Sequence, residues 1–139
     1  MYHLAYFSTA TKYFSEQELK QLLTYSKENN QKINITGILL FIEGCFLQIL
    51  EGEQATVNAL YHKIKKDTRH SDILRIFEGE TTERVFKKWS MGFKNIPFVE
   101  YKQQTGFEDI SNDDFIDKVI KTNHPKIIQT LHNFYDDIF

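Results

Sequence analysis

The stretch ITGILLFIEGCFLQILEG, residues 35–52, contains two apolar runs separated by a short turn signal. The runs are Ile35–Ile42 and Phe46–Leu50, and the Glu43-Gly44 pair between them is typical of the turn of a β-hairpin. Because side chains alternate between the two faces of a strand, Gln48 is expected on an otherwise apolar face of the second strand. The rest of the predicted fold extends from this hairpin in both directions.

A strand and a helix are expected before the hairpin. Tyr2–Ser8 is rich in aromatic and aliphatic residues, which is typical of a strand. Ser15 and Glu18 form a capping box, in which each side chain satisfies a backbone donor at a helix start, so a helix is predicted over about Glu16–Glu28. The inward stripe of that helix changes from apolar to polar toward Asn30, which favours a group with polar edges beside its end.

A second helix and two further strands are expected after the hairpin. Their predicted ranges are about Gln54–Lys66, Ile73–Glu80 and roughly Lys88–Ile96. The resulting order βαββαββ predicts an α+β fold, with a ferredoxin-like sheet that has both helices on one face.

The C-terminal part of the chain is predicted to cover the other face of the sheet. A cap signal at Ser111 begins the first of two helices, Pro125 opens the second, and Pro97–Asp109 reads as the linker before them. We therefore expect residues 1–96 to form one domain, and residues 97–139 to form a linker and a two-helix cap of the same unit.

Composition excludes several classes of function. With 17 Lys and Arg against 19 Asp and Glu, the formal net charge is -2, which argues against binding to nucleic acid or to an anionic membrane surface. The single cysteine, Cys45, cannot form an intrachain disulfide, and the histidines are scattered, so no metal site is predicted and a cytoplasmic protein is expected. No apolar run is long enough to span a bilayer, and no glycine-rich phosphate loop is present.

Four polar side chains from different elements are expected to approach the space between the two helices and the sheet. They are Tyr6, Asn30, Gln48 and Asp67. A buried amide or phenol without a partner costs about 1 to 3 kcal/mol, so each of them needs a hydrogen-bond partner. The residues alone leave two interpretations equally open: they satisfy one another in an ordinary core, or they surround a planar heterocycle with polar edges.

Other candidate residues have ordinary structural explanations. The spacing of Lys63 and Asp67 favours an exposed i,i+4 ion pair, and Trp89 and Met91 favour core packing. His70 follows a helix end, where it would interact favourably with the negative end of the helix dipole. Each of these residues, taken by itself, favours a structural role over a chemical one.

Six short segments occur together in a specific order and spacing. They are Tyr6-Phe7-Ser8, Asn29-Asn30, residues 35–40 (ITGILL), residues 44–52 (GCFLQILEG), residues 67–70 (DTRH) and residues 89–93 (WSMGF). In these segments the chain resembles the BLUF family, the flavin-dependent blue-light sensors, from Tyr2 to about Phe93. So many segments in register are more specific than any one of them, and they favour a ligand pocket over an ordinary core.

The resemblance implies a flavin between the two helices, with FAD as the usual ligand and FMN or riboflavin as substitutes. The residues that match cofactor-binding positions of the family are Asn29, Asn30, Gln48, Lys63, Asp67 and His70. Among them, Asn30 matches the residue that hydrogen-bonds the pyrimidine edge of the flavin. Many relatives have Arg in place of Lys63, and Lys lacks the planar fork that a bidentate contact requires.

The resemblance also implies a photochemical role for Tyr6 and Gln48. Tyr6 would donate an electron and a proton after the flavin is excited, and Gln48 would be left rearranged by tautomerisation, rotation or both. An amide suits this role because it carries both a donor and an acceptor. Ser8, Trp89 and Met91 match positions that relay the change, and whether Trp89 or Met91 faces the ring stays open.

We expect a light-regulated interaction module that signals to a separate protein effector and is not an enzyme. Short members of the family often assemble, so a homo-oligomer is expected as well. The alternative is a small flavin-dependent reductase or another ferredoxin-like enzyme. An RNA-binding module is disfavoured because the C-terminal helices are expected to cover the sheet face that it would need.

Overall fold

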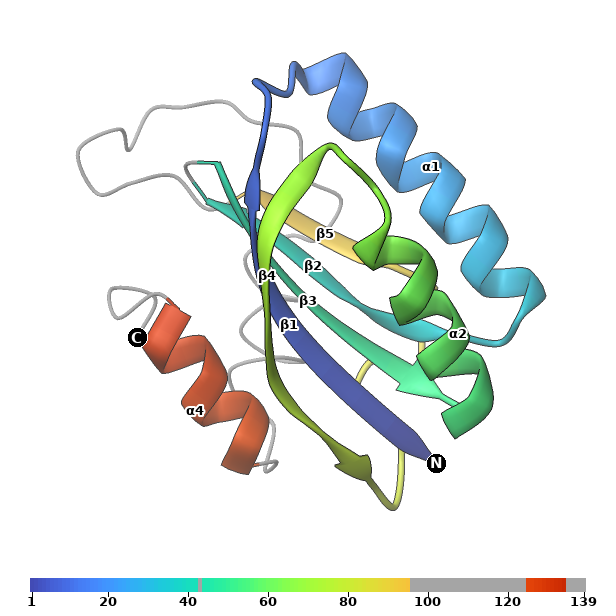
Figure 1. Ribbon diagram of the computed structural model, residues 1–139. Coiled ribbons are helices and arrows are strands. Elements are labelled where there is room, and N and C mark those ends of the chain that lie inside the picture. Colours follow the sequence, from blue (N-terminus) through green and yellow to red (C-terminus); the bar gives the residue numbers. More distant parts are fainter. Residues whose placement is uncertain (43, 96–124, 135–139) are drawn as a thin grey trace.

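The computed structural model describes residues 1–42, 44–95 and 125–134 of the chain (Figure 1). The helices and strands follow the predicted order. They are β1 (Tyr2–Ala10), α1 (Glu16–Lys32), β2 (Thr36–Ile42), β3 (Cys45–Gly52), α2 (Gln54–Lys65), β4 (His70–Glu80), β5 (Gly92–Asn95) and α4 (Pro125–Phe134). The predicted linker over 97–109, the helix predicted after Ser111 and the predicted end of the last strand at Ile96 lie outside the described residues.

The strands form one mixed sheet in the order β4-β1-β3-β2-β5. β1 pairs antiparallel with β3 and with β4, β2 pairs antiparallel with β3, and β5 pairs parallel with β2. The first four strands have the order of a ferredoxin-like sheet, which confirms the predicted fold class, and β5 extends the sheet beyond β2. The predicted hairpin is therefore β2 and β3, and β3 is the central strand.

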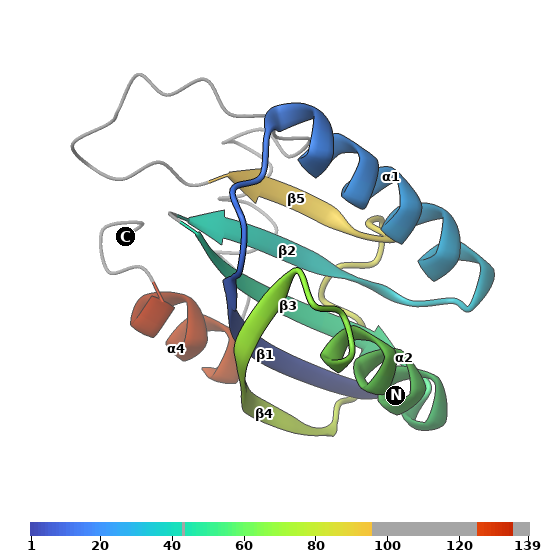
Figure 2. The ribbon, with the colours of Figure 1, turned by 45° about the horizontal axis from the view of Figure 1, so that its top comes forward.

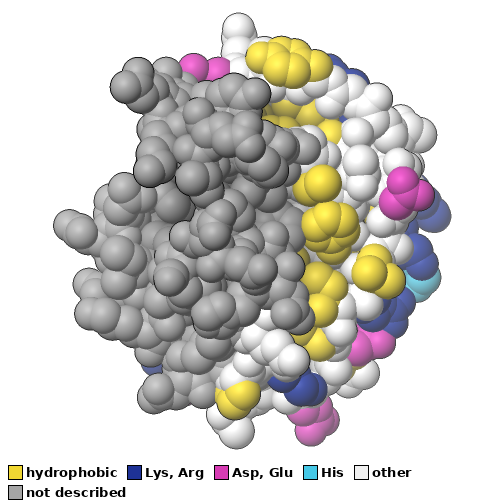
Figure 3. All heavy atoms as spheres, turned by 90° about the vertical axis from the view of Figure 1, so that its left-hand side faces the viewer, with side chains coloured by type: hydrophobic (Ala, Val, Ile, Leu, Met, Phe, Trp, Pro, Cys, Tyr) yellow, Lys and Arg dark blue, Asp and Glu magenta, His cyan; other side chains and the backbone are white. Residues whose placement is uncertain are grey.

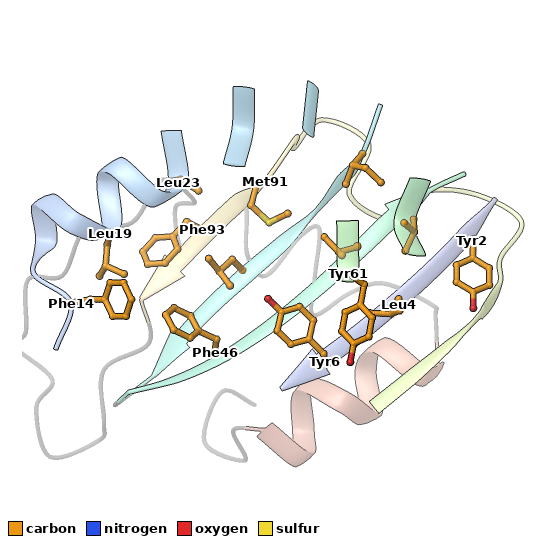
Figure 4. Close-up of a cluster of buried hydrophobic side chains, with 14 residues drawn as sticks. Tyr2, Leu4, Tyr6, Phe14, Leu19, Leu23, Phe46, Tyr61, Met91 and Phe93 are labelled. Atoms are coloured by element: carbon orange, nitrogen blue, oxygen red, sulfur yellow. The ribbon is translucent and has the colours of Figure 1, made fainter. Parts of the chain in front are cut away.

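α1 and α2 lie on one face of the sheet, and α4 lies on the other (Figure 1, Figure 2). Alternation along β3 separates the two sides, because Phe46 and Leu50 are buried on the helix side, whereas Leu47 and Ile49 are buried on the α4 side with Ile127. Figure 4 shows the cluster on the helix side. The prediction that a C-terminal helix opens at Pro125 and covers the second face is confirmed for α4.

The first helix begins at its predicted cap and ends later than predicted. The Glu18 amide donates to Ser15 Oγ at 3.1 Å, and the Ser15 amide donates to the Glu18 carboxylate at 3.2 Å, so the capping box is formed. The helix continues to Lys32 instead of ending near Glu28. Asn30 is only 3% exposed, and its packing outweighs the low helix propensity of asparagine.

The strand predicted over Lys88–Ile96 is shorter in the structure, where β5 begins at Gly92. The Trp89 amide donates to the Phe86 carbonyl at 3.1 Å, and the Trp89 carbonyl accepts from the Gly37 amide at 3.0 Å. The backbone of Trp89 is therefore hydrogen-bonded in a turn and to Gly37 of β2. It does not take part in the regular pairing of β5. β4, in contrast, begins earlier than predicted.

β4 is an edge strand that leaves large apolar side chains in contact with solvent. Leu74 is 63% exposed and Ile76 is 39% exposed. Figure 3 views the molecule from the left-hand side of Figure 1 and shows a band of hydrophobic side chains on that face. Exposed apolar groups on an edge strand are suited to contacts with another protein.

Replacing Gly37 with Ala is expected to destabilise the sheet strongly. A Cβ atom at this position would lie 2.0 Å from the carbonyl oxygen of Ile49 in the neighbouring strand. We expect the free energy of unfolding, measured by urea denaturation, to fall by about 3 kcal/mol or more. Gly44→Asn is the matched control, because Gly44 has open space around it and a φ of 79°, which asparagine tolerates. Equal losses in the two variants would contradict this steric explanation.

Candidate functional site

A cavity lies between α1, α2 and the helix-side face of the sheet. Its volume is about 150 Å³, far more than one buried water needs. The apolar part of its wall consists of Phe14, Leu22, Leu39, Phe46, Leu60 and Ile64. The polar and aromatic remainder consists of Tyr6, Tyr25, Ser26, Asn29, Asn30, Gln48, Lys63, Asp67, Arg69 and His70. Most of the surface of the wall is nonetheless apolar, because the polar residues contribute only small parts of it, and such a wall with placed polar groups is typical of a ligand pocket.

The structure brings all the predicted cofactor positions to this one cavity. Those residues are Asn29, Asn30, Gln48, Lys63, Asp67 and His70, and the predicted photoactive Tyr6 lines the wall with them. The three predicted relay residues, Ser8, Trp89 and Met91, are not part of the wall. They lie behind it, and two of them contact wall residues directly.

Tyr6 and Gln48 are joined by a short hydrogen bond at the cavity wall. The two residues are direct partners in the antiparallel pairing of β1 and β3, which sends both side chains to the helix side. The Tyr6 hydroxyl donates to Gln48 Oε1 at 2.5 Å, and both side chains are almost fully buried. Figure 4 shows Tyr6 within the helix-side cluster. The phenol and the amide are therefore held together by the backbone register itself.

Tyr6 is kept protonated by its surroundings. Burial raises the pKa of the Tyr6 hydroxyl, and the nearby Tyr61 and Asp67 raise it further. A phenol whose pKa is raised retains its proton at physiological pH. It can therefore donate a hydrogen bond to a neighbouring acceptor.

Met91, and not Trp89, lies next to the Gln48 amide. Gln48 Nε2 donates to Met91 Sδ at 3.4 Å, and Met91 is fully buried in the helix-side cluster. Trp89 stacks on Phe86, with ring centroids 6.1 Å apart and an interplanar angle of 19°, and packs against the cluster on the α4 side. Of the two residues, Met91 is therefore the one that contacts Gln48 on the helix side, and neither of them lines the cavity wall.

The two asparagines at the end of α1 face different partners. Asn30 Nδ2 donates to the carbonyl oxygen of Ser90 at 2.9 Å, so it ties α1 to the chain just before β5. Asn29 Nδ2 donates to the carbonyl oxygen of Tyr25 at 2.9 Å, one turn earlier in the same helix. Asn30 is thus the buried member of the pair, and Asn29 is the half-buried one.

The charged groups at the cavity edge do not pair as their spacing suggests. Asp67 forms its ion pair with Arg69, whose Nε lies 2.9 Å and 3.0 Å from the two carboxylate oxygens, instead of with Lys63. The hydrogen bonds from Arg69 lower the pKa of Asp67 to about 2, so this carboxylate is charged at physiological pH. The Lys63 ammonium lies 6.0 Å from the centre of the Tyr25 ring, so it approaches α1 across the gap between the helices.

His70 connects the end of α2 to β1. The His70 ring lies 2.7 Å through Nε2 from the carbonyl oxygen of Ile64 and 2.8 Å through Nδ1 from Ser8 Oγ. Since a carbonyl only accepts, a neutral His70 carries its proton on Nε2, and Nδ1 accepts from the Ser8 hydroxyl. His70 thus lies at the negative end of α2, as expected, where it donates to one of the last carbonyls of the helix, and its second hydrogen bond joins it to the predicted relay residue Ser8.

Tyr25 and Arg69 are residues of the cavity wall to which the sequence gave no role. Tyr25 lies one helical turn before Asn29, so the helical period could have placed it on the same face. Arg69 stands inside the DTRH segment, but its pairing with Asp67 depends on how the chain turns after α2. The first signal was therefore available from spacing, whereas the second required the fold.

The residues of the cavity fit a flavin. A flavin is a flat ring system with an apolar body and polar edges, and it needs apolar walls together with amide donors and acceptors. Asn30 and Gln48 supply such amides from two different elements, and Lys63 supplies a charged donor. In contrast, the described residues contain no group of three or more His, Cys, Asp or Glu side chains that could hold a metal ion. None of the helices in the described ranges combines the length and apolar character needed to cross a bilayer.

Comparisons with known proteins agree with this site. Among curated proteins, the photoactivated adenylate cyclase subunit alpha of Euglena gracilis is 39% identical over 83 residues, which are 60% of this chain and 8% of that protein. The chain therefore spans only a small part of the curated relatives that it matches. Among solved structures, a bacterial light-regulated adenylyl cyclase matches with a TM-score of 0.69 at 31% identity, over 98% of this chain and 34% of that one. BlsA in its ground state matches with a TM-score of 0.68 at 25% identity, over 99% of this chain and 86% of that one.

Residues 1–92 match the family described as BLUF, sensors of blue-light using FAD. That description is of a sensor, which supports the prediction that this module is not itself an enzyme, although several relatives are named as cyclases. The match covers most of the chain and includes every predicted cofactor position. The chain therefore belongs to the BLUF family of blue-light sensors, whose cofactor is FAD.

Proposed function

We propose that this protein is a blue-light photoreceptor that holds FAD, or FMN or riboflavin in its place, and signals by rearranging the hydrogen bond between Tyr6 and Gln48. The observation that carries the proposal is that bond, 2.5 Å long, between a buried phenol and a buried amide at the wall of the cavity. An ordinary core would explain the bond but not the cavity beside it. A ligand with polar edges explains both.

Residues from both helices and from the sheet would hold the flavin at its edges. We assign this role to Asn29, Asn30, Gln48, Lys63, Asp67 and His70, all of which line the cavity. Asn30 comes from the last turn of α1 and Gln48 from the central strand, so their amides offer donors and acceptors from two directions. Asp67 keeps its charge through Arg69 and can accept a hydrogen bond from the ligand at the cavity edge.

The photochemical step depends on Tyr6 and Gln48. A bound flavin would supply the absorption of blue light and an acceptor for one electron and one proton. Tyr6 would be the donor of both, and both would return to its hydroxyl group afterwards. Gln48 then forms its hydrogen bonds in a new arrangement, by rotation or tautomerisation, since the amide carries a donor and an acceptor on one planar group. Its contact with Met91 Sδ changes in the same event.

Ser8, Trp89 and Met91 are the residues to which we assign the relay of this change. Met91 contacts Gln48 directly, and Trp89 lies close by in the same segment, on the α4 side of the sheet. Each rearranged hydrogen bond contributes about 1 kcal/mol net, whereas inverting a two-state population takes about 5.5 kcal/mol. The switch can therefore bias an interaction with another molecule without rebuilding the fold.

We further propose that the output is an interaction with a separate protein effector, made by a homo-oligomer. The exposed apolar side chains of Leu74 and Ile76 on edge strand β4 support a protein contact on this side of the sheet. The names of the relatives, photoactivated and light-regulated cyclases, support light control of another protein function.

In darkness, the purified protein with FAD is expected to show a flavin absorption spectrum. Under blue light this spectrum should move slightly to the red, and it should recover in darkness. Tyr6→Phe should keep the yellow colour and lose the shift, because the cavity is retained while the hydroxyl bond to Gln48 is removed. Absorption spectra before, during and after illumination measure both effects.

Tyr61→Phe is the matched control for the loss of a phenol. Tyr61 is buried beside Tyr6, with ring centroids 5.7 Å apart, but it does not bond to Gln48. This variant should keep the light-induced shift. A folded protein that stays colourless in excess flavin, or that turns yellow and ignores light, would overturn the proposed function. Oxidation of NADPH that does not depend on light would instead favour the reductase.

Asn30→Ala is expected to weaken flavin binding roughly five- to thirtyfold, because one or two hydrogen bonds of about 1 kcal/mol each are removed. Titration of riboflavin, FMN and FAD, followed by flavin fluorescence, measures the affinity. Asn58→Ala in α2 is the control, since Asn58 lies outside the cavity wall. If the Asn30 variant binds as tightly as the unaltered protein, Asn30 does not contact the flavin.

A further inference from the structure

Glu51 is a buried carboxylate for which the function proposed above has no use. It lies near the end of β3 and is 0% exposed. Its carboxylate accepts three hydrogen bonds, from the Val85 amide at 2.6 Å, from the Phe86 amide at 3.0 Å and from the Thr36 hydroxyl at 2.9 Å. Burying a carboxylate is costly, and such a set of donors offsets much of that cost.

Arg84 completes the surroundings of Glu51. Its guanidinium donates to Thr36 Oγ1 at 2.7 Å, to the main-chain carbonyl of Glu51 at 3.1 Å and to the carbonyl of Asn34 at 2.8 Å. Burial raises the pKa of Glu51, while its hydrogen-bond donors and the charge of Arg84 act in the opposite direction. The start of β2, the end of β3 and the chain after β4 are thus tied together at one point.

The chain that Glu51 holds passes from one side of the sheet to the other. Phe86 is 1% exposed and belongs to the cluster on the α4 side, against which Trp89 also packs. Met91, a few residues later, belongs to the cluster on the helix side, where Figure 4 shows it close to the sheet. The 85–91 segment therefore connects the two faces.

Two cavity residues hold the far end of this segment. Asn30 Nδ2 donates to the Ser90 carbonyl at 2.9 Å, and Gln48 Nε2 donates to Met91 Sδ at 3.4 Å. Both bonds are made by side chains, whereas the bonds at the Glu51 end involve two backbone amides. A charge-assisted bond is stronger than one to a thioether sulfur, so the Glu51 end is the firmer of the two.

We propose that Glu51 is a positioning residue for the light response: by fixing the start of the 85–91 segment, it holds Met91 against Gln48. The inference rests on the function proposed above and deepens it. Gln48 and Glu51 lie on the same strand but point to opposite faces, so the segment is attached to β3 on both sides of the sheet. A rearrangement of Gln48 therefore acts on Met91, is resisted by the fixed Glu51 end and is transmitted along the 85–91 segment.

Glu51→Gln is the test. A carboxamide has one acceptor oxygen instead of two, so it cannot serve Val85, Phe86 and Thr36 as the carboxylate does. With FAD bound, the variant should keep the light-induced red shift and recover in darkness at least fivefold faster, because Met91 no longer holds the rearranged amide. Hydrogen exchange of the Val85 and Phe86 amides, measured in darkness, should accelerate at least tenfold.

Two controls separate positioning from general stability. Glu53→Gln makes the same chemical change two residues away, on an exposed side chain that makes no capping bond, and should leave both measurements unchanged. Val57→Ala removes buried apolar volume in α2, away from the segment, and should lower the midpoint of unfolding without changing dark recovery. Equal acceleration of recovery in Val57→Ala and Glu51→Gln would overturn the proposal.

Recovery within twofold of the unaltered protein, or unchanged amide exchange, in Glu51→Gln would also overturn it. If this variant does not fold, Thr36→Val, which removes one donor and keeps the carboxylate, should accelerate recovery two- to threefold, and no change there would reject the proposal. If the unaltered protein shows no red shift at all, the proposed function fails. The exchange measurement still decides whether Glu51 holds the segment.

Discussion

The cross-strand pairing of Tyr6 with Gln48 is the constraint on which the rest of the structure depends. In the antiparallel register of β1 and β3 the two residues are direct partners, and alternation along each strand sends both side chains to the helix side. A slip of β1 or β3 by one residue would turn Tyr6 or Gln48 toward the α4 side and out of the cavity. Leu47 and Ile49, buried on the opposite face, oppose such a slip. The same alternation therefore sets the apolar core and the polar site.

The polar groups of the site form hydrogen bonds with one another and with the backbone, within the protein itself. Tyr6 bonds to Gln48, Asn30 bonds to the carbonyl of Ser90, and His70 links Ser8 to the end of α2. Leaving such a group unpaired costs about 1 to 3 kcal/mol, whereas exchanging one partner for another costs much less. A change at the amide must therefore move between discrete arrangements in which the buried groups keep partners. This is the physical basis for the proposed switch, which moves between discrete arrangements and is not a gradual distortion.

The chain before β5 shows where reasoning from sequence fails. Its apolar residues favoured a longer strand, but the Phe86 carbonyl and the Gly37 amide engage the backbone of Trp89, and the regular ladder begins only at Gly92. The same segment places Met91 on one face of the sheet and Trp89 on the other, although both residues read as core material. Neither result follows from local pattern, because both depend on groups that are distant in the sequence.

The sequence by itself determined the elements, the ferredoxin-like order and most of the polar residues around the cavity, because periodicity, capping and turn signals are local and the family motifs occur in register. It also placed Gln48 on the correct face of β3, since strand alternation has a fixed period. Only the tertiary structure decided that α1 continues to bury Asn30, that Asp67 pairs with Arg69 and that Glu51 anchors the segment before β5. In each case several partners could satisfy the same buried or charged group. Which of them does so depends on distances that exist only after the chain has folded.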